Sequence, residues 1–275
     1  MRNLKAYLSI LRIQTVSMLQ YRAAAWARMS TFAFYGFVHV VLILIFYRYG
    51  VNAGAGERAG MTEAQAVSYT WLTQIVASIL PVMGSDSTVR GKIVNGDVGI
   101  ELCRPLDLYA HWFSRAMATK LAPFLLSLVP VTALAMLLPA PYNLQAPASP
   151  EGLLAMLLCL CTGLLLSCSV VCLSYCLLLN LKWGDGPVNI MLVVTDLLSG
   201  SFLPLQLWPD WAQGLLYWQP FAGLLDFPLR FYVGTMAPGM VWQAVGIQLI
   251  WIIAFVAAGK ALMSRSLRHV VIQGG

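Results

Sequence analysis

An acidic residue lies inside one of the most apolar stretches of this sequence. Asp196 follows the run GPVNIMLVVT and stands roughly 12 Å into a helix that we expect to begin near Val188, at 1.5 Å per residue. A carboxylate is costly in hydrocarbon, so an acid within a membrane span is a functional candidate. Asp196 could contact a cationic or hydroxylated substrate, line a path between subunits, or bind a proton or cation. Alternatively, it could be a protonated or hydrogen-bonded group that supports a helix break at Gly200.

Cysteines form a second pattern that could do chemistry. Cys161, Cys168, Cys172 and Cys176 follow one another at helical spacing on one predicted face, with Cys159 nearby. Thiolates can bind copper(I) or zinc. However, no His lies in that stretch, and four ligands along one helix are too spread out to surround one ion. Cysteine also packs well as a small apolar residue, so we expect packing rather than a metal site, and no structural disulfide.

The remaining candidates do not assemble into a catalytic centre. His39 lies in an apolar run and is expected to be a neutral, packed side chain, and neither His111 nor His269 is paired with a nucleophile. A His, Ser or Glu cluster that would indicate an intramembrane enzyme is not evident. The phosphate-binding loop G-x-x-x-x-G-K-[ST] is also absent from the sequence, so no ATP hydrolysis and no cofactor are expected in this chain.

The composition shows which elements must position these residues. Of 275 residues, 59% are hydrophobic and only 10% are charged, with a mean hydropathy of +0.75. Such a chain has too little polar surface for a soluble domain, which predicts an all-helical membrane protein. A spanning helix needs roughly 20 mostly apolar residues, and six stretches qualify. The predicted spans are Trp26 to Tyr49, Gln65 to Gly84, Met117 to Leu138, Leu153 to Leu181, Val188 to Leu207, and Val241 to Met263.

The segments between and before the spans also have distinct patterns. Residues 1–22 lack the pattern of a cleavable signal peptide and instead predict a basic, amphipathic helix at the membrane interface, the alternative being a solvated tail. Residues 207–240 are rich in aromatic residues and proline, which favours short, re-entrant helices at the outer surface. The whole of 1–275 is expected to form one transmembrane domain.

Lys and Arg residues predict the orientation, because they are retained on the cytoplasmic side. With the N-terminus inside, only Arg48, Arg58 and Arg230 of the 17 Lys and Arg residues lie outside. Both termini are therefore expected in the cytoplasm. The net charge of +6 is explained by this topology, and no basic and aromatic pattern indicates nucleic acid.

A charged loop, residues 85–116, separates the second and third predicted spans. Val89 and Ile93 lie one helical turn apart among polar residues, which predicts a short surface helix that ends near Gly96. Proline after Arg104 favours an extended step, and Asp107 can cap the next helix. The loop could simply retain positive charge inside the cell, but its mixed charges and apolar residues favour a surface that docks on protein.

Two pieces of the chain carry a resemblance to a known family. The loop VRGKIVNGDVGIELCRPLDLY and the later SGSFLPLQLWPDWAQGLLYWQPFAGLLDFPLRFYVG resemble the permease subunit of type-two ATP-binding-cassette exporters. The resemblance implies that Ser87 to Asn95 is the coupling helix, which rests on an ATPase subunit, with Glu101 to Asp107 beside it. The coupling residues implied in this way are Val89, Arg90, Ile93, Glu101, Arg104 and Asp107.

The same resemblance implies partners and a location. ATP and Mg²⁺ would bind a separate ATPase chain, and a second permease, identical or distinct, would complete the path; a pair of distinct permeases is slightly favoured. The complex would export an amphipathic compound, such as a drug-like molecule, a peptide or a lipid-linked glycan, across a bacterial inner membrane. The alternative is an ion-coupled secondary transporter that uses Asp196, although no internal repeat typical of many such carriers is evident.

Overall fold

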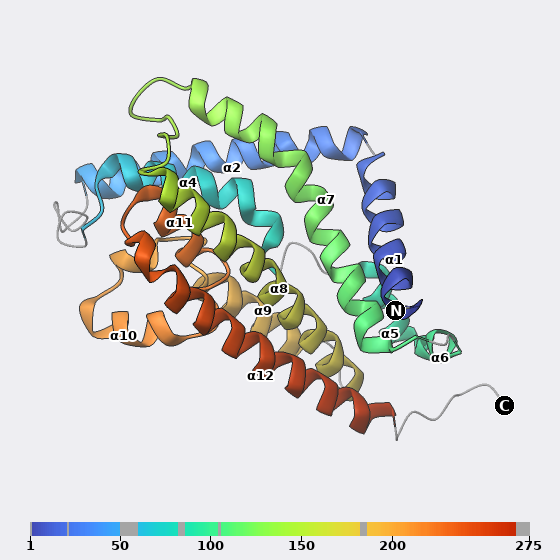
Figure 1. Ribbon diagram of the computed structural model, residues 1–275. Helices are drawn as coiled ribbons and strands as arrows, with labels where there is room; N and C mark the ends of the chain where they lie inside the picture. Colours follow the sequence, from blue (N-terminus) through green and yellow to red (C-terminus); the bar gives the residue numbers. More distant parts are fainter. Residues whose placement is uncertain are drawn as a thin grey trace.

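The computed structural model describes residues 2–20, 22–49, 60–81, 86–103, 106–181 and 186–267, and the regular structure within these ranges is entirely helical (Figure 1). This agrees with the predicted fold class. The four longest helices are α2 (Arg22–Tyr49), α7 (Leu108–Leu137), α8 (Pro150–Asn180) and α12 (Val241–Leu267).

Four helices are long and apolar enough to cross a membrane. They comprise α7, α8, the Met29–Tyr49 part of α2, and α12 together with the short 3₁₀ turn η4 (Pro238–Met240) before it. These correspond to the first, third, fourth and sixth predicted spans. The number of spanning-length helices in the described residues is thus four, where the sequence predicted six spans.

The second and fifth predicted spans form shorter helices. Helix α4 (Glu63–Val76) is followed by the 3₁₀ turn η1 (Ala77–Ile79), and α9 covers only Gly186–Leu198. The prediction that the fifth span continues to Leu207 is wrong. Gly200 adopts a left-handed φ of +86°, which ends the regular helix and which glycine tolerates best.

Short helices follow α9, as the proline-rich pattern predicted. They are η3 (Leu205–Leu207), α10 (Asp210–Trp218) and α11 (Asp226–Val233), with η4 directly before α12. Helix α11 packs against α8 and α4, and all but one of its residues are buried. Helix α11 is therefore an integral part of the helical packing, whereas only Ala212 and Leu216 of α10 are buried.

Helix α8 is the centre of the fold. It packs against α12, α11 and α7, and it runs alongside α12 in Figure 1. Cys159, Cys168, Cys172 and Cys176 are fully buried on α8, in agreement with the packing role expected from the sequence, whereas Cys161 is exposed. The prediction that Cys161 shares one face with Cys168, Cys172 and Cys176 is therefore wrong. Helix α1 (Arg2–Leu19) packs along α7.

Candidate functional site

The charged loop contains two short helices at the end of α7, α5 (Ser87–Asn95) and α6 (Val98–Leu102) (Figure 1). Helix α5 has the bounds that the sequence predicted. Its first turn is capped by Asp86, whose side chain accepts a hydrogen bond of 2.9 Å from the Thr88 amide. It ends at Gly96, which has a left-handed φ of +80° suited to glycine.

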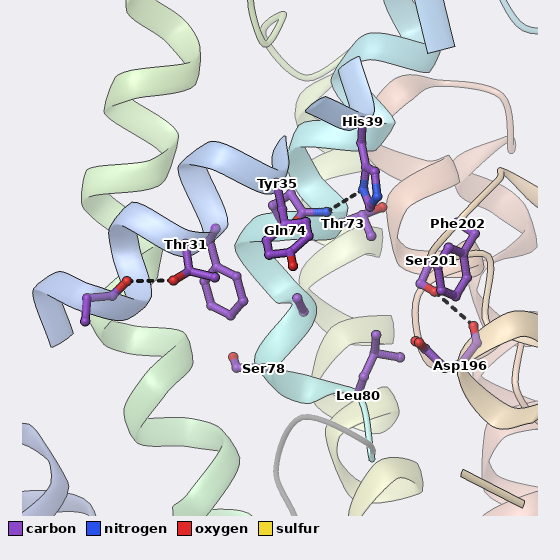
Figure 2. Close-up of a pocket in the computed structure, with 13 residues that line it drawn as sticks. Thr31, Tyr35, His39, Thr73, Gln74, Ser78, Leu80, Asp196, Ser201 and Phe202 are labelled. Atoms are coloured by element: carbon purple, nitrogen blue, oxygen red, sulfur yellow. Dashed lines mark hydrogen bonds between the residues drawn. The ribbon is translucent and has the colours of Figure 1, made fainter. Parts of the chain in front are cut away.

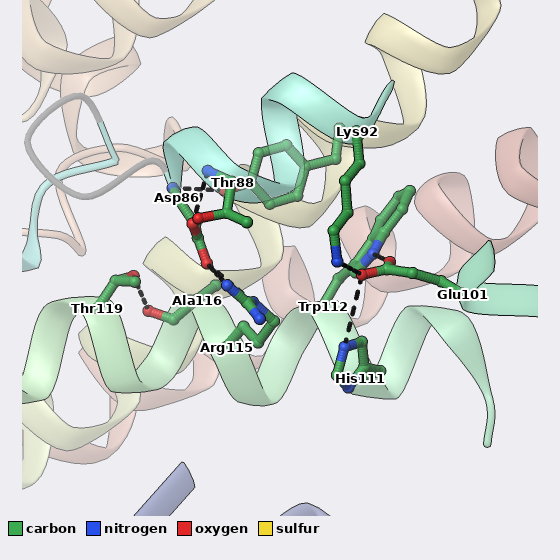
Figure 3. Close-up of polar contacts among 10 residues, drawn as sticks. Asp86, Thr88, Lys92, Glu101, His111, Trp112, Arg115, Ala116 and Thr119 are labelled. Atoms are coloured by element: carbon green, nitrogen blue, oxygen red, sulfur yellow. Dashed lines mark hydrogen bonds and ion pairs between the residues drawn. The ribbon is translucent and has the colours of Figure 1, made fainter. Parts of the chain in front are cut away.

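An ion pair ties the start of α5 to the long helices. Oδ2 of Asp86 accepts hydrogen bonds of 2.8 and 2.6 Å from Nε and Nη2 of Arg115 on α7. The Asp86 amide donates to the Tyr175 hydroxyl on α8 at 2.8 Å. One residue therefore connects α5 to both α7 and α8 (Figure 3).

A second buried acid ties α5 and α6 to α7. The Glu101 carboxylate accepts hydrogen bonds of 2.7 Å from Lys92 Nζ and from Trp112 Nε1, and Nε2 of His111 lies 3.9 Å from it. Burial raises the pKa of Glu101, but the bonds from Lys92 and Trp112 outweigh that effect, and its pKa is lowered. The carboxylate is therefore held in its charged form (Figure 3).

A cavity of about 550 Å³ lies between α2, the α4–η1 segment and the residues that end and follow α9. Asp196 lines it, as do residues from helices far apart in sequence (Figure 2). The lining residues are Ala27, Thr31, Phe32, Tyr35, His39, Thr73, Gln74, Ala77, Ser78, Leu80, Asp196, Ser201 and Phe202. A volume of this size can hold a drug-sized ligand.

Polar contacts in the cavity wall arrange the groups around Asp196. Its backbone carbonyl accepts hydrogen bonds of 2.6 Å from Ser199 Oγ and 3.0 Å from Ser201 Oγ. On the opposite wall, Gln74 Nε2 and His39 Nδ1 lie 3.2 Å apart. His39, which the sequence predicted to be a neutral, packed side chain, is half-buried, lines the cavity and bonds to Gln74 of α4.

A family model for ABC-2 family transporter proteins matches residues 33–274, which include all of the cavity lining except Ala27, Thr31 and Phe32. The chain belongs to the ABC-2 transporter family. This identifies it as a permease subunit of an ABC-2 type transporter and as a multi-pass membrane protein, in agreement with the resemblance read from the sequence. No curated protein and no solved structure matched the chain.

In this ABC-2 permease, the structure contradicts part of the predicted set of partner-contact residues in the predicted coupling segment. Val89 and Ile93, expected as apolar anchors on a partner, are only 1% and 9% exposed because they pack into the core between α5, α7 and α8. Glu101 is 4% exposed. These three side chains attach the segment to its own chain, so they are not available to a partner in this conformation.

The other predicted coupling residues have different environments. Arg90 is half-buried beside Tyr175 of α8 and Val188 of α9. Asp107 caps α7 by accepting a hydrogen bond of 2.7 Å from the Ala110 amide, which confirms the predicted cap, and its own amide donates to the Tyr7 hydroxyl of α1 at 3.0 Å. Arg104 lies outside the described residues.

The sequence did not reveal a buried acid in the segment that we predicted to lie at the outer surface. Asp226 is 1% exposed, and Oδ1 accepts bonds of 3.2 Å from the Tyr69 hydroxyl and the Leu205 amide. Arg230 Nη1 donates to Oδ2 at 3.4 Å, and the Tyr69 hydroxyl also lies 3.2 Å from the carbonyl of Gly200. These contacts fix the backbone of the permease at Gly200 and Leu205, directly after helix α9 ends. The only local sequence signal for these contacts was the i, i+4 spacing of Asp226 and Arg230, which suits an ion pair on a helix.

Proposed function

We propose that this permease is the transmembrane subunit of an ATP-driven exporter whose energy comes from a separate ATPase chain. The observation that carries the proposal, beside the family, is the attachment of α5 and α6 to the long helices. Asp86 joins α5 to α7 and α8, and Glu101 joins α5, α6 and α7. A displacement of the coupling segment by a partner would therefore be transmitted to the spans.

The ATPase would bind the opposite, solvent-facing side of the segment. Three apolar residues of α5 and α6 are exposed, with exposures of 65% for Val94, 66% for Ile100 and 41% for Leu102. A cluster of exposed apolar residues beside charged ones is typical of a protein contact. We therefore assign the ATPase contact to this Val94–Ile100–Leu102 surface, with Val89, Ile93 and Glu101 supporting it from behind.

The proposal includes a six-span topology with both termini in the cytoplasm of a bacterial cell. The six spans would be α2, α4 with η1, α7, α8, α9 and α12. Eleven of the fourteen residues of α4 are buried, so neighbouring helices rather than lipid surround it, and a short apolar helix can then lie at membrane depth. By the same argument, the buried helix α11 would be an outer, partly re-entrant helix, whereas α10, in which only Ala212 and Leu216 are buried, would lie at the outer surface.

A second permease subunit would complete the transport path. The cavity is formed by α2, α4 and α9 of one chain, and its flanks carry exposed apolar residues such as Phe34 on α2 and Val193 on α9. A second chain placed against these flanks would enclose the cavity. A related but distinct permease remains the favoured partner over a second copy of this chain.

The experiment is co-expression with a candidate phosphate-loop ATPase from the same genome, followed by co-purification. Leu102→Asp should abolish ATPase co-purification because it places a charge in the apolar contact. The matched control is Leu215→Asp on outer helix α10, where the leucine is 73% exposed, and this variant should retain the ATPase. Equal recovery of the ATPase with both variants would contradict the assigned surface.

The second candidate function is an ion-coupled carrier, which the position of Asp196 in the cavity favours. Transport into vesicles separates the two functions. Uptake that requires ATP and survives collapse of the proton gradient supports the exporter. Uptake that persists without ATP and stops when the gradient collapses supports the carrier.

A further inference from the structure

The cavity has an unbalanced charge. Asp196 is its single acidic residue, His39 is its single titratable base and is hydrogen-bonded to Gln74, and no Lys or Arg is found among the lining residues that the structure describes. None of the ion pairs within the described ranges includes Asp196. A charged carboxylate that faces a largely apolar cavity without a Lys or Arg partner is unfavourable, and it becomes favourable when it binds a proton or when a ligand supplies the positive charge.

A second, independent feature of the cavity also indicates a ligand. Ser78 lines the cavity and is 1% exposed, and its hydroxyl has no hydrogen-bond partner among the described residues. Buried hydroxyls are nearly always hydrogen-bonded, so one that lines a cavity without a partner is explained by a bound group. In the view of Figure 2, Ser78 and Asp196 lie on opposite sides of Leu80.

The rest of the wall is suited to an aromatic or aliphatic body. Phe32, Tyr35 and Phe202 contribute rings, and Ala77 and Leu80 contribute aliphatic surface. Aromatic faces also attract organic cations, more strongly where water is excluded. In contrast, no Lys or Arg among the described lining residues would compensate a negative charge on a ligand, and the ring of His39 is already paired with Gln74 through Nδ1.

We propose that the cavity binds an amphipathic organic cation, with Asp196 as its counter-ion and Ser78 as a hydrogen-bond partner for a polar group at the other end. The proposal rests on the proposed function only in naming this ligand as the exported substrate. The preference for a cation is derived from the lining residues of the cavity alone. It excludes anionic compounds, such as lipid-linked glycans with phosphate groups, as the preferred cargo.

Binding to the full-length chain, purified with its co-purifying partners into neutral lipid vesicles, tests this specificity without ATP. The probes are tetraphenylphosphonium and tetraphenylborate, two ions of matched shape and opposite charge, with protein-free vesicles as the blank. Saturable binding of the cation alone is expected. Equal saturable binding of both ions, or of neither, would overturn the proposal.

Two substitutions assign the charge preference to one residue. Asp196→Asn should weaken tetraphenylphosphonium binding by about tenfold or more, which corresponds to at least about 1.4 kcal/mol, whereas Asp196→Glu should retain the preference for the cation. The control Asp210→Asn removes an exposed acid of α10 and should change nothing. A loss of binding in Asp210→Asn, or unchanged binding in Asp196→Asn, would overturn the role of Asp196.

The hydroxyl is tested with a cation that has hydrogen-bonding groups. Ethidium carries amino groups and tetraphenylphosphonium carries none, so Ser78→Ala should weaken only ethidium binding, by roughly threefold to tenfold for one hydrogen bond. Equal effects on both cations would reject this contact. Because these measurements need no ATP, their failure would leave the ATPase co-purification result intact, and loss of ATPase coupling would leave the charge preference intact.

Discussion

Oε2 of Glu101 lies 2.7 Å from Nε1 of Trp112, and the indole is completely buried on α7. Together with the bond from Lys92 to Oε1, this contact makes Glu101 a buried link between the coupling segment and a long helix. Its side chain is thus part of the internal support of the permease, although its charge in a loop predicted to be cytoplasmic had suggested an intermolecular contact.

Replacement of Glu101 by Ala should destabilise the protein. It leaves the Trp112 indole N–H buried without an acceptor and removes the partner of Lys92, at a cost on the order of 1–3 kcal/mol. A lowered midpoint of thermal unfolding in detergent would measure this. Glu63→Ala is the control, because Glu63 pairs with Arg48 where both side chains are partly exposed, and such surface pairs contribute little.

The same residue predicts a dependence of stability on pH. Its pKa is lowered in the folded protein, so its charge stabilises the fold above its unfolded pKa of about 4.3. That contribution is lost as the pH falls from there through the lower, folded pKa. The difference in unfolding midpoint between wild type and Glu101→Gln should therefore be constant near neutral pH and shrink below about pH 4. A difference that grows on acidification would contradict the assignment.

Asp86 has two roles that one substitution can separate. Asn caps helices about as well as Asp, so Asp86→Asn should retain α5 but lose the charged pair with Arg115. We expect the ATPase still to co-purify, because Asp86 is buried and lies away from the Val94–Ile100–Leu102 surface. Transport per ATP hydrolysed should fall, because α5 is less firmly attached to α7.

The comparison that tests this role is Leu102→Asp, which should lose the ATPase itself. If Asp86→Asn also lost the ATPase, the ion pair would support the docking surface instead of transmitting motion. If Asp86→Asn matched wild type in both assays, the pair would have no part in coupling.

Local sequence rules predicted the ends of elements in this chain but not the contacts between them. Gly96 and Asp107 mark helix ends by their own backbone and capping chemistry. The one-turn spacing of Val89 and Ile93 predicted a helix with an apolar face, but not whether that face meets the chain's own core or a partner.

The cavity could not be predicted because its wall depends on long-range packing. Asp196 was a candidate from its position in an apolar run, whereas Ser78 and Gln74 lie in a different helix more than a hundred residues earlier and have no distinctive local pattern. Only the packing of α2, α4 and α9 brings them to one cavity. Single-sequence periodicity contains no information on such neighbours.

Substitution of Gly200 tests the break after α9. Its φ of +86° is strained for any residue with a Cβ, and a Cβ there would lie 2.5 Å from the Tyr69 hydroxyl. Gly200→Ala should therefore lower the unfolding midpoint strongly and displace Tyr69 from Asp226. Gly96→Ala is a matched control, since Gly96 has a φ of +80° and no other atom lies within 4 Å of the added Cβ. This variant should lose only the free energy of holding an alanine in the left-handed conformation, roughly 1–2 kcal/mol. Similar losses in the two variants would mean that the contact with Tyr69 is unimportant.

Reporter fusions can decide between six spans and four. If only α2, α7, α8 and α12 crossed the membrane from a cytoplasmic N-terminus, Asn95 would lie outside and Ala146 inside. If α4 and α9 also cross, both positions are reversed, with Asn95 inside and Ala146 outside. We expect the second result, because it places Arg90, Lys92 and Arg115 in the cytoplasm, where basic residues are retained. Alkaline phosphatase should be active when it is fused after Ala146 and inactive when it is fused after Asn95. The opposite pattern would reject the six-span topology. It would also reject a cytoplasmic docking surface at Val94.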